Sequence, residues 1–345
     1  MATFNSLEFT GSYSSFNGNL FSTKNTSSAG FLFYSGSDMY FTSQNSSAWS
    51  ISGATKAQRR TYGGGVGDQS AFFEFGGEVP NVGHSNTSCI YNGSSWANGP
   101  NMSTTGRSQM GSFGTVNGAV AAGGGLQPNG AISTNVTEEY NGSSWSSGGN
   151  MIASTYGNGL RDVGSAGQSG AAGLVFGGKN YPTNATCPLK CTEAYDGTSW
   201  STQSPLIVQA QRTKGFGTQN DAVRVAGWTY GYPGICQSEQ DWKVEGYDGT
   251  SWSNLPNHPI GGARLEAMGI NSNSGQTIGG TPNCYITCNT GWNGSSWYSR
   301  STLPCDVLGN NRGGNNALVG EGIYTYSCQL LEESTDVNIQ IKKLS

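Results

Sequence analysis

Side chains that could carry acid–base or metal chemistry are scarce in this chain. The two histidines, His84 and His258, fall in segments that we expect to be well-separated loops, so the sequence predicts no shared metal site. The adjacent carboxylates of Glu138 and Glu139 are interpreted as solvated charges rather than as an acid–base pair. The chain shows no Ser-His-Asp set and no phosphate-binding loop. The sequence therefore predicts a protein that is not an enzyme and that needs no metal or cofactor.

The chain has eight cysteines, and four of them form two pairs with the same spacing. Residues four apart in an extended strand lie about 13 Å apart, which is too far for a disulfide. If the chain bends where a loop meets a strand, the pairs Cys187–Cys191 and Cys284–Cys288 would each form a local disulfide. The alternative is that the cysteines are reduced thiols, as is usual in the cytosol.

The most suggestive binding segment is aromatic and rich in glycine. Trp228, Tyr230 and Tyr232 stand among glycines in the segment 228–234, and Tyr181 lies in the corresponding loop of the preceding repeat. Such side chains would offer a stacking platform for sugar rings. The alternative is that they pack the loop onto its neighbours. We treat these four residues as the predicted ligand-binding set.

A recurring hairpin motif organises the rest of the chain. Tyr195-Asp196-Gly197-Thr198-Ser199-Trp200 is one of five close copies, and a sixth copy is degenerate. The dipeptides Asp-Gly and Asn-Gly predict a two-residue hairpin turn in which both residues have positive φ. The repeat length is about 50 residues, which indicates a tandem array of one supersecondary unit. The final tryptophans are expected to fill the space between repeats: Trp49, Trp96, Trp145, Trp200, Trp252 and Trp297.

A glycine pair and an arginine recur in phase with the hairpin. The arginine stands roughly 15 residues before the glycine pair, which the Gly177-Gly178 copy illustrates. We expect the arginines to satisfy backbone carbonyls or to bridge neighbouring repeats, because a planar guanidinium suits that task. The alternative is a ring of arginines that lines a channel and binds an anion. The series comprises Arg60, Arg107, Arg161, Arg212 and Arg264.

The order arginine, strand, turn, apolar strand, Gly-Gly, loop, Tyr, turn, Trp resembles the kelch repeat. The resemblance covers roughly residues 30–330 and departs in one place, since Tyr195 and Trp200 are closer together than in the usual kelch repeat. Kelch repeats form the four-stranded blades of β-propellers, so the resemblance implies an all-β chain folded as a single propeller. The YNGSSW and YDGTSW motifs are similar to kelch-like arrays in structural proteins of tailed, particularly marine, bacteriophages.

Seven glycine positions predict seven blades, and the six hairpin tryptophans leave six as the alternative. We expect one propeller over 1–345, with an N-terminal closing segment at 1–29, blades at 30–330 and a C-terminal closing segment at 331–345. Residues 3–10 alternate between apolar and polar and are expected to complete the last blade, because terminal pairing removes exposed strand edges. The outer strand of that blade would otherwise come from 336–344.

The two faces of such a propeller should differ. The turns between first and second strands, and between third and fourth strands, are short and lie on one face. The loops between second and third strands, and the connections between blades, lie on the other face and vary in length. Variable loops on a rigid scaffold are the usual place for binding, so we expect the second face, called here the variable face, to be the interaction surface.

Composition narrows the class of protein. Charged residues make up only 11% of the chain and the net charge is -4, without the clustered Lys and Arg of a nucleic-acid surface. No apolar run approaches the roughly 18 residues of a membrane helix, so membrane insertion is not expected. Residues 1–25 lack the pattern of a secretory signal.

With the resemblance, these features predict a structural or adhesion component of a phage virion. It would belong to a tail fibre, a baseplate or the head surface, and it would be extracellular after host lysis. Its partners would be other virion proteins or a host-surface glycan or receptor. A homo-oligomer within the particle is one alternative for its assembly. The other hypotheses are a carbohydrate-active or oxidase propeller enzyme and a cellular kelch module that binds proteins.

Overall fold

A computed structural model describes most of the chain as strands and turns, with no helix among the described residues. The described ranges are 31–35, 38–43, 49–55, 60–68, 70–79, 82–126, 132–152, 159–180, 188–232, 235–281, 289–300, 312–313, 318–320, 329–333 and 340–344. For the strands at 31–55 and from 312 onward, and for 230–239, 263–264 and 280–281, the description covers the backbone alone.

The chain divides into two compact units, one of 1–48 with 334–345 and one of 49–333. In the first unit, β1 (Phe31–Ser35), β2 (Asp38–Ser43) and β32 (Gln340–Leu344) form an antiparallel sheet in the order β1-β2-β32. Segments near both ends of the chain therefore pair with each other.

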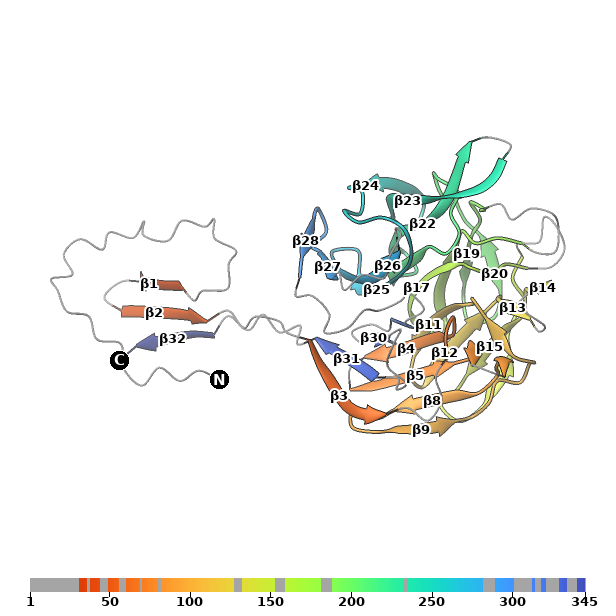
Figure 1. The fold of residues 1–345 in the computed structure, drawn as a ribbon, viewed down its shortest axis with the longest axis horizontal. Helices are drawn as coiled ribbons and strands as arrows, with labels where there is room; N and C mark the ends of the chain where they lie inside the picture. Colours follow the sequence, from red (N-terminus) through yellow and green to blue (C-terminus); the bar gives the residue numbers. More distant parts are fainter. Residues whose placement is uncertain are drawn as a thin grey trace. The chain divides into compact units, whose positions relative to one another are not determined.

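The second unit contains six four-stranded antiparallel sheets among its described residues (Figure 1). The first two sheets are β4 (Gly64–Asp68), β5 (Ala71–Phe75), β8 (Ser88–Tyr91) and β9 (Trp96–Gly99), then β11 (Gly111–Thr115), β12 (Gly118–Ala122), β15 (Thr137–Tyr140) and β16 (Trp145–Ser147). The next two are β17 (Gly164–Ser169), β18 (Ala172–Phe176), β19 (Thr192–Tyr195) and β20 (Trp200–Thr202), then β21 (Lys214–Thr218), β22 (Asp221–Tyr232), β23 (Ile235–Tyr247) and β24 (Trp252–Leu255).

The last two sheets are β25 (Ala263–Asn271), β26 (Ser274–Thr281), β27 (Asn289–Trp292) and β28 (Trp297–Ser299), then β29 (Arg312–Gly313), β30 (Leu318–Gly320), β31 (Gln329–Glu333) and β3 (Trp49–Thr55). Short additional strands are β6 (Glu78–Val79), β7 (Gly83–His84), β10 (Arg107–Ser108), β13 (Gly125–Leu126) and β14 (Ile132–Ser133). The first strand of each sheet contacts two other first strands, in the succession β4, β11, β17, β21, β25, β29 and back to β4. This arrangement is compatible with a β-propeller.

The fourth strand of the last sheet comes from the other end of the unit. β3 pairs with β31, Trp49 opposite Glu333. β3 thus takes the edge that was expected for residues 3–10 or 336–344. Residues 340–344 pair with β2 instead, and 3–10 lie outside the described residues. Residues 31–43, which were expected in the blade array, belong to the other unit. The reason is that each hairpin tryptophan begins the fourth strand of a sheet. Trp49 therefore begins the fourth strand of a sheet whose first three strands lie between residues 312 and 333.

Strand register places the connections on two opposite edges. In the first sheet Gly64, Phe75, Ser88 and Gly99 are aligned across the four strands at one end. Tyr91 pairs with Trp96 at the other end, where the hairpin motif turns. The loop between second and third strands and the connection to the next sheet therefore share an edge, as the topology predicts. This edge is the variable face.

The hairpin motif forms a four-residue loop, so the prediction of a two-residue turn is wrong. Tyr195 pairs with Trp200, and the Asp196 N–H donates to the Ser199 carbonyl at 3.2 Å. The Asp196 carboxylate accepts the backbone N–H of Thr198 at 2.8 Å and of Ser199 at 2.7 Å. Within this loop only Gly197 has positive φ. The side-chain carboxylate fixes the loop by local hydrogen bonds.

Aromatic packing between sheets provides much of the core. The buried Trp145 of β16 stacks on Phe73 at 5.7 Å and meets Phe75 edge-on at 4.9 Å, both from the preceding sheet. Trp200 packs against Phe113 of the preceding sheet in the same way, and its indole N–H donates to the Thr137 hydroxyl. These tryptophans therefore fill the space between neighbouring sheets, as expected.

Candidate functional site

Two members of the arginine series satisfy backbone carbonyls inside the protein. The fully buried Arg107 donates from Nη1 to the carbonyls of Gly123 at 2.9 Å and Val136 at 2.8 Å. Arg60 donates from Nη1 to the Gly76 carbonyl at 3.0 Å. Gly123 and Gly76 each begin a glycine pair, so the recurrent spacing of arginine and glycine reflects a direct hydrogen bond in these two sheets.

Glu138 is buried, which corrects its interpretation as a solvated charge. Its carboxylate pairs with Arg107 Nη2 at 2.7 Å. It also accepts the backbone N–H groups of Ser103 at 2.7 Å and Thr104 at 2.9 Å, in the connection from the preceding sheet. Glu138 therefore binds the connection to the sheet. The adjacent Glu139 accepts a hydrogen bond from the Tyr195 hydroxyl of the following sheet.

Arg161 and Arg212 do not continue the series in space. A row of backbone hydrogen bonds links the positions just before the first strands: Gln109 N–H to Tyr62 O, Asp162 N–H to Gln109 O, and Arg212 N–H to Asp162 O. All four residues have positive φ, which marks one structural position in four sheets. Arg60 and Arg107 precede this position by two residues, whereas Arg161 precedes it by one and Arg212 occupies it. The Arg264 side chain lies outside the description.

The spacing in the sequence hides this shift of Arg161, because β17 contains an extra residue. Its pairing with β18 shifts between Ala166 and Ser169, so the strand bulges there. This residue restores the spacing from Arg161 to its glycine pair, although the arginine stands one position later than Arg107. A uniform ring of arginines is therefore not formed by the described side chains.

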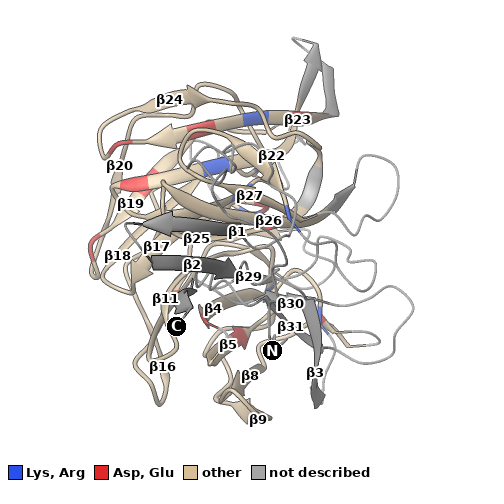
Figure 2. Ribbon diagram, turned by 90° about the vertical axis from the view of Figure 1, so that its left-hand side faces the viewer, with Lys and Arg blue, Asp and Glu red and all other residues tan. Residues whose placement is uncertain are grey.

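The cations at this edge surround an internal anion. The buried Asp162 carboxylate lies 2.9 Å from Lys179 Nζ and 3.6 Å from Arg212 Nε. Burial acts to raise the pKa of Asp162, but Lys179 and Arg212 hold it below its ordinary value. Lys214 Nζ lies 2.8 Å from Glu266 Oε1 nearby. Charged residues also lie on several of the described strands (Figure 2), and Arg224 forms a second buried group of this kind with Asp241 and Glu245.

A narrow cavity, called here the central cavity, lies between the first strands. One end of it, near Asp162, Arg212, Lys214 and Glu266, has a volume of about 40 Å³, which is enough for a water molecule. At the level of Ser112 and Ser165 the lining residues are small. The Ser165 hydroxyl donates to the Ser112 carbonyl at 2.9 Å and so joins two first strands.

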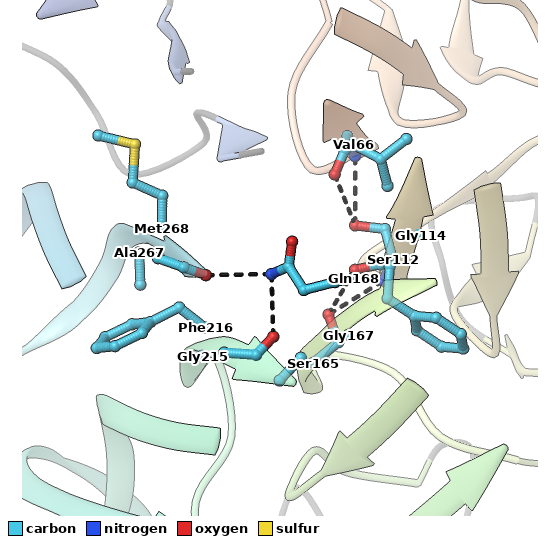
Figure 3. Close-up of a pocket in the computed structure, with 15 residues that line it drawn as sticks. Val66, Ser112, Gly114, Ser165, Gly167, Gln168, Gly215, Phe216, Ala267 and Met268 are labelled. Atoms are coloured by element: carbon cyan, nitrogen blue, oxygen red, sulfur yellow. Dashed lines mark hydrogen bonds between the residues drawn. The ribbon is translucent and has the colours of Figure 1, made fainter. Parts of the chain in front are cut away.

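Gln168 lies across the other end of the central cavity. Its Nε2 donates to the carbonyls of Gly217 at 3.1 Å and Gly269 at 3.3 Å, on β21 and β25 (Figure 3). Sequence reasoning missed this residue. The sequence signal for it was one extra residue in this repeat. After its second glycine, β17 has Gln168 and Ser169, whereas β11 and β21 have a single Thr at that place.

The predicted ligand-binding set falls mainly on a long hairpin of β22 and β23, which extends beyond the other strands of its sheet (Figure 1). The half-buried Trp228 lies under the Arg212 guanidinium, 4.5 Å from its ring centre. Trp228 therefore packs against Arg212, which itself pairs with Asp162, and this contact agrees with a packing role. The side chains of Tyr230 and Tyr232 lie outside the description, as does Tyr181 entirely.

Both histidines are buried among protein partners. His258 Nε2 lies 2.8 Å from the Thr277 hydroxyl, and Nδ1 accepts the Gly261 N–H at 3.1 Å. Burial lowers the pKa of His258 to about 4. His84 Nδ1 lies 3.0 Å from the Gly125 carbonyl. Within the described ranges no three metal-ligating side chains come together.

The predicted local disulfides receive no support from the cysteines that the structure describes. Cys191 is a free, partly buried thiol, and burial raises its pKa. A disulfide from Cys191 to Cys187 is therefore not formed, although Cys187 itself lies outside the description. Cys284 and Cys288 also lie outside it. Cys89 lies 3.4 Å from Arg60 Nη2, which donates to its sulfur.

One aromatic residue that sequence reasoning passed over is exposed. Trp242 of β23 exposes 45% of its surface, whereas the other tryptophan side chains that the structure describes are buried or half-buried. It belongs to no copy of the hairpin motif, so the repeat offered no signal for it.

No protein-family model matches the chain, and no curated protein matches it. None of the described segments is a helix long and apolar enough to cross a membrane.

Proposed function

We propose that the six four-stranded sheets are the blades of one closed propeller of kelch type, six-bladed rather than seven-bladed. The circular succession of contacts between first strands supports the closure. Each sheet also has one hairpin tryptophan at the start of its fourth strand, including Trp49 in the sheet that joins both ends of the unit. The first of the seven glycine positions that predicted seven blades is Ser35-Gly36, and it falls in the other unit.

The protein serves, in this proposal, as a non-enzymatic structural or adhesion component of a phage particle. It presents its variable face to another virion protein or to a host-surface glycan. The resemblance of the YNGSSW and YDGTSW motifs to kelch-like phage arrays supports the setting. The buried ionic groups support a scaffold role, because Arg107, Glu138 and Asp162 bind other parts of the fold.

The contrast between the two faces carries the proposal. On one face the turn of the hairpin motif is the same four-residue loop in five sheets. On the other, the second and third strands of one sheet continue into a hairpin of 12 and 13 residues, while β18 and β19 have 5 and 4. A constant scaffold with one elaborated face is the arrangement expected of a binding protein.

Shortening the long hairpin tests this proposal. Thr229 and Glu239 are cross-strand partners, so an Asn-Gly turn in place of 230–238 closes a shorter hairpin in the same register. Purified full-length protein and this variant would be applied to a glycan array and to the separated proteins of the phage particle. We expect the full-length protein to bind at least one of them and the shortened variant to bind more weakly.

The matched control changes the opposite face. Asn141→Asp alters a hairpin loop where other copies already carry Asp, so binding should persist. The phage proposal would be abandoned if the protein were absent from purified particles by mass spectrometry. Equal binding by the shortened variant would instead move the binding site away from the hairpin.

A further inference from the structure

One backbone position on the variable face recurs in four sheets. The carbonyl of Asn86 accepts the N–H of Met102 at 2.8 Å, and the carbonyl of Trp242 accepts the N–H of His258 at 2.8 Å. In both cases a residue just before the third strand's paired segment binds the connection to the next sheet. The equivalent bonds in the two sheets between them run from Met151 to Asn135 and from Leu206 to Lys190.

The side chain at this position usually binds the same connection. Asn86 Nδ2 donates to the Met102 carbonyl at 3.2 Å, and Asn135 Nδ2 donates to the Met151 carbonyl at 3.4 Å. Lys190 Nζ donates in a similar way to the Ile207 carbonyl at 2.6 Å. In the long-hairpin sheet an indole takes the place of this polar donor. The scaffold therefore accepts a polar residue here, and Trp242 departs from the repeat.

The indole of Trp242 is seated on a glycine. A Cβ added to Gly261 would come within 2.4 Å of the indole Cδ2, so the ring lies directly against the glycine backbone. Gly261 also has a φ of +64°, which favours glycine. Opposite Ala226 the pairing of β22 and β23 shifts, which leaves Trp242 and Lys243 in a bulge. Bulges commonly re-aim a side chain.

Two polar residues stand close to Trp242 in the sequence or along its backbone hydrogen bond. Lys243 follows it in sequence, and Asn257 precedes the residue whose N–H binds the Trp242 carbonyl; both are exposed. A single exposed apolar side chain often needs no explanation. Here, however, the indole replaces a scaffold donor and rests against Gly261.

We propose that Trp242 is a stacking platform for a pyranose ring of a host-surface glycan. A pyranose has an apolar C–H face that covers an indole, and hydroxyl groups around its rim that hydrogen-bond to polar side chains such as Lys243 and Asn257. A protein partner would instead be expected to cover several apolar side chains around an aromatic anchor. The inference rests on the proposed adhesion function and names the sugar-binding residue within it.

The test substitutes the residue that other sheets use. Trp242→Asn matches Asn86 and Asn135, so the fold should be retained, which thermal unfolding would check. Full-length protein and variants would be tested on a glycan array and against methyl glycosides of glucose, galactose and N-acetylglucosamine by saturation-transfer NMR. We expect Trp242→Asn to weaken binding by about tenfold or more, and Trp242→Phe to retain most of it.

The outcomes separate this inference from the proposed function. If the shortened hairpin variant loses glycan binding while Trp242→Asn keeps it, the adhesion role stands and the Trp242 platform is overturned. If the full-length protein binds no sugar but captures a virion protein, the platform is again overturned. If Trp242→Asn loses sugar binding but keeps the melting temperature of the full-length protein, and Trp242→Phe keeps sugar binding, the platform is supported.

Discussion

At the level of single residues, the connections between sheets show how one position can carry different chemistry. Met102, Met151 and Leu206 are buried where the connection meets its sheet, and their N–H groups bind equivalent carbonyls. His258 occupies the same position and is equally buried. The imidazole is accommodated by Thr277 and by the Gly261 N–H, so it behaves as a core side chain that is able to titrate.

The burial of His258 predicts an acid-sensitive contribution to stability. Its pKa is lowered from 6.5 to about 4, so the unfolded chain binds this proton at higher pH than the folded protein. The contribution is present above pH 6.5 and is lost as the pH falls toward 4. We expect the free energy of unfolding to lose roughly 3 kcal/mol from this residue across that window.

Denaturant unfolding between pH 4 and 7 would measure the effect. His258→Met copies the residue at the equivalent position of two other sheets and should flatten this part of the pH profile. Met151→Leu serves as the control and should leave the profile unchanged. An unaltered slope in His258→Met would show that the histidine does not titrate in this range.

At the level of elements, the hairpin loops depend on a side-chain acceptor as well as on glycine. Asn141 Oδ1 accepts the N–H groups of Ser143 and Ser144, both at 3.0 Å, and Asp196 makes the same contacts in its own copy. The backbone donors on Ser199 and Thr198 hold the pKa of Asp196 below its ordinary value. Asn and Asp are therefore equivalent in this loop at neutral pH.

This equivalence makes a prediction about loop stability. Asn141→Asp should leave the free energy of unfolding nearly unchanged, because the carboxylate accepts the same two N–H groups. Asn141→Ala removes the acceptor and should cost about 1 kcal/mol. Denaturant titration of the two variants at pH 7 would measure both effects. A larger loss for Asp than for Ala would contradict the role assigned to the side-chain oxygen.

At the level of the whole molecule, the two ends of the unit of 49–333 are joined in one sheet, because its first strand pairs with its last strand. β3 completes the sheet of β29, β30 and β31, and Trp49 pairs with Glu333. Such pairing closes a sheet edge that would otherwise be exposed. The strands β1, β2 and β32 form their own sheet in the other unit.

Truncation distinguishes the two units. A chain of 49–333 should unfold cooperatively with a melting temperature close to that of the full chain. A chain of 56–333 lacks β3 and should melt lower by more than about 5 °C, since loss of a strand costs several kcal/mol of packing and pairing. Calorimetry of both chains would measure this difference. Equal melting of the two truncated chains would rule out β3 as the closing strand.

The sequence by itself determined the local, repeated features. The period of about 50 residues predicted a tandem array of one unit, with the final tryptophans between repeats, and the contacts of Trp145 and Trp200 follow that prediction. The hydrogen bond from Arg107 to Gly123 was visible as a recurrent spacing. These features were predictable because each depends on residues within one repeat or on the immediate neighbour.

Only the tertiary structure decided the features that depend on distant segments or on register. The extra residue in β17 concealed the true position of Arg161, because spacing in sequence cannot show a bulge. The role of β3 depends on pairing between residues near 50 and near 330. The contact of the Trp242 indole with Gly261 joins β23 to the connection that leads to the next sheet. Composition could indicate an aromatic binding residue, but which indole faces solvent is set by packing between segments.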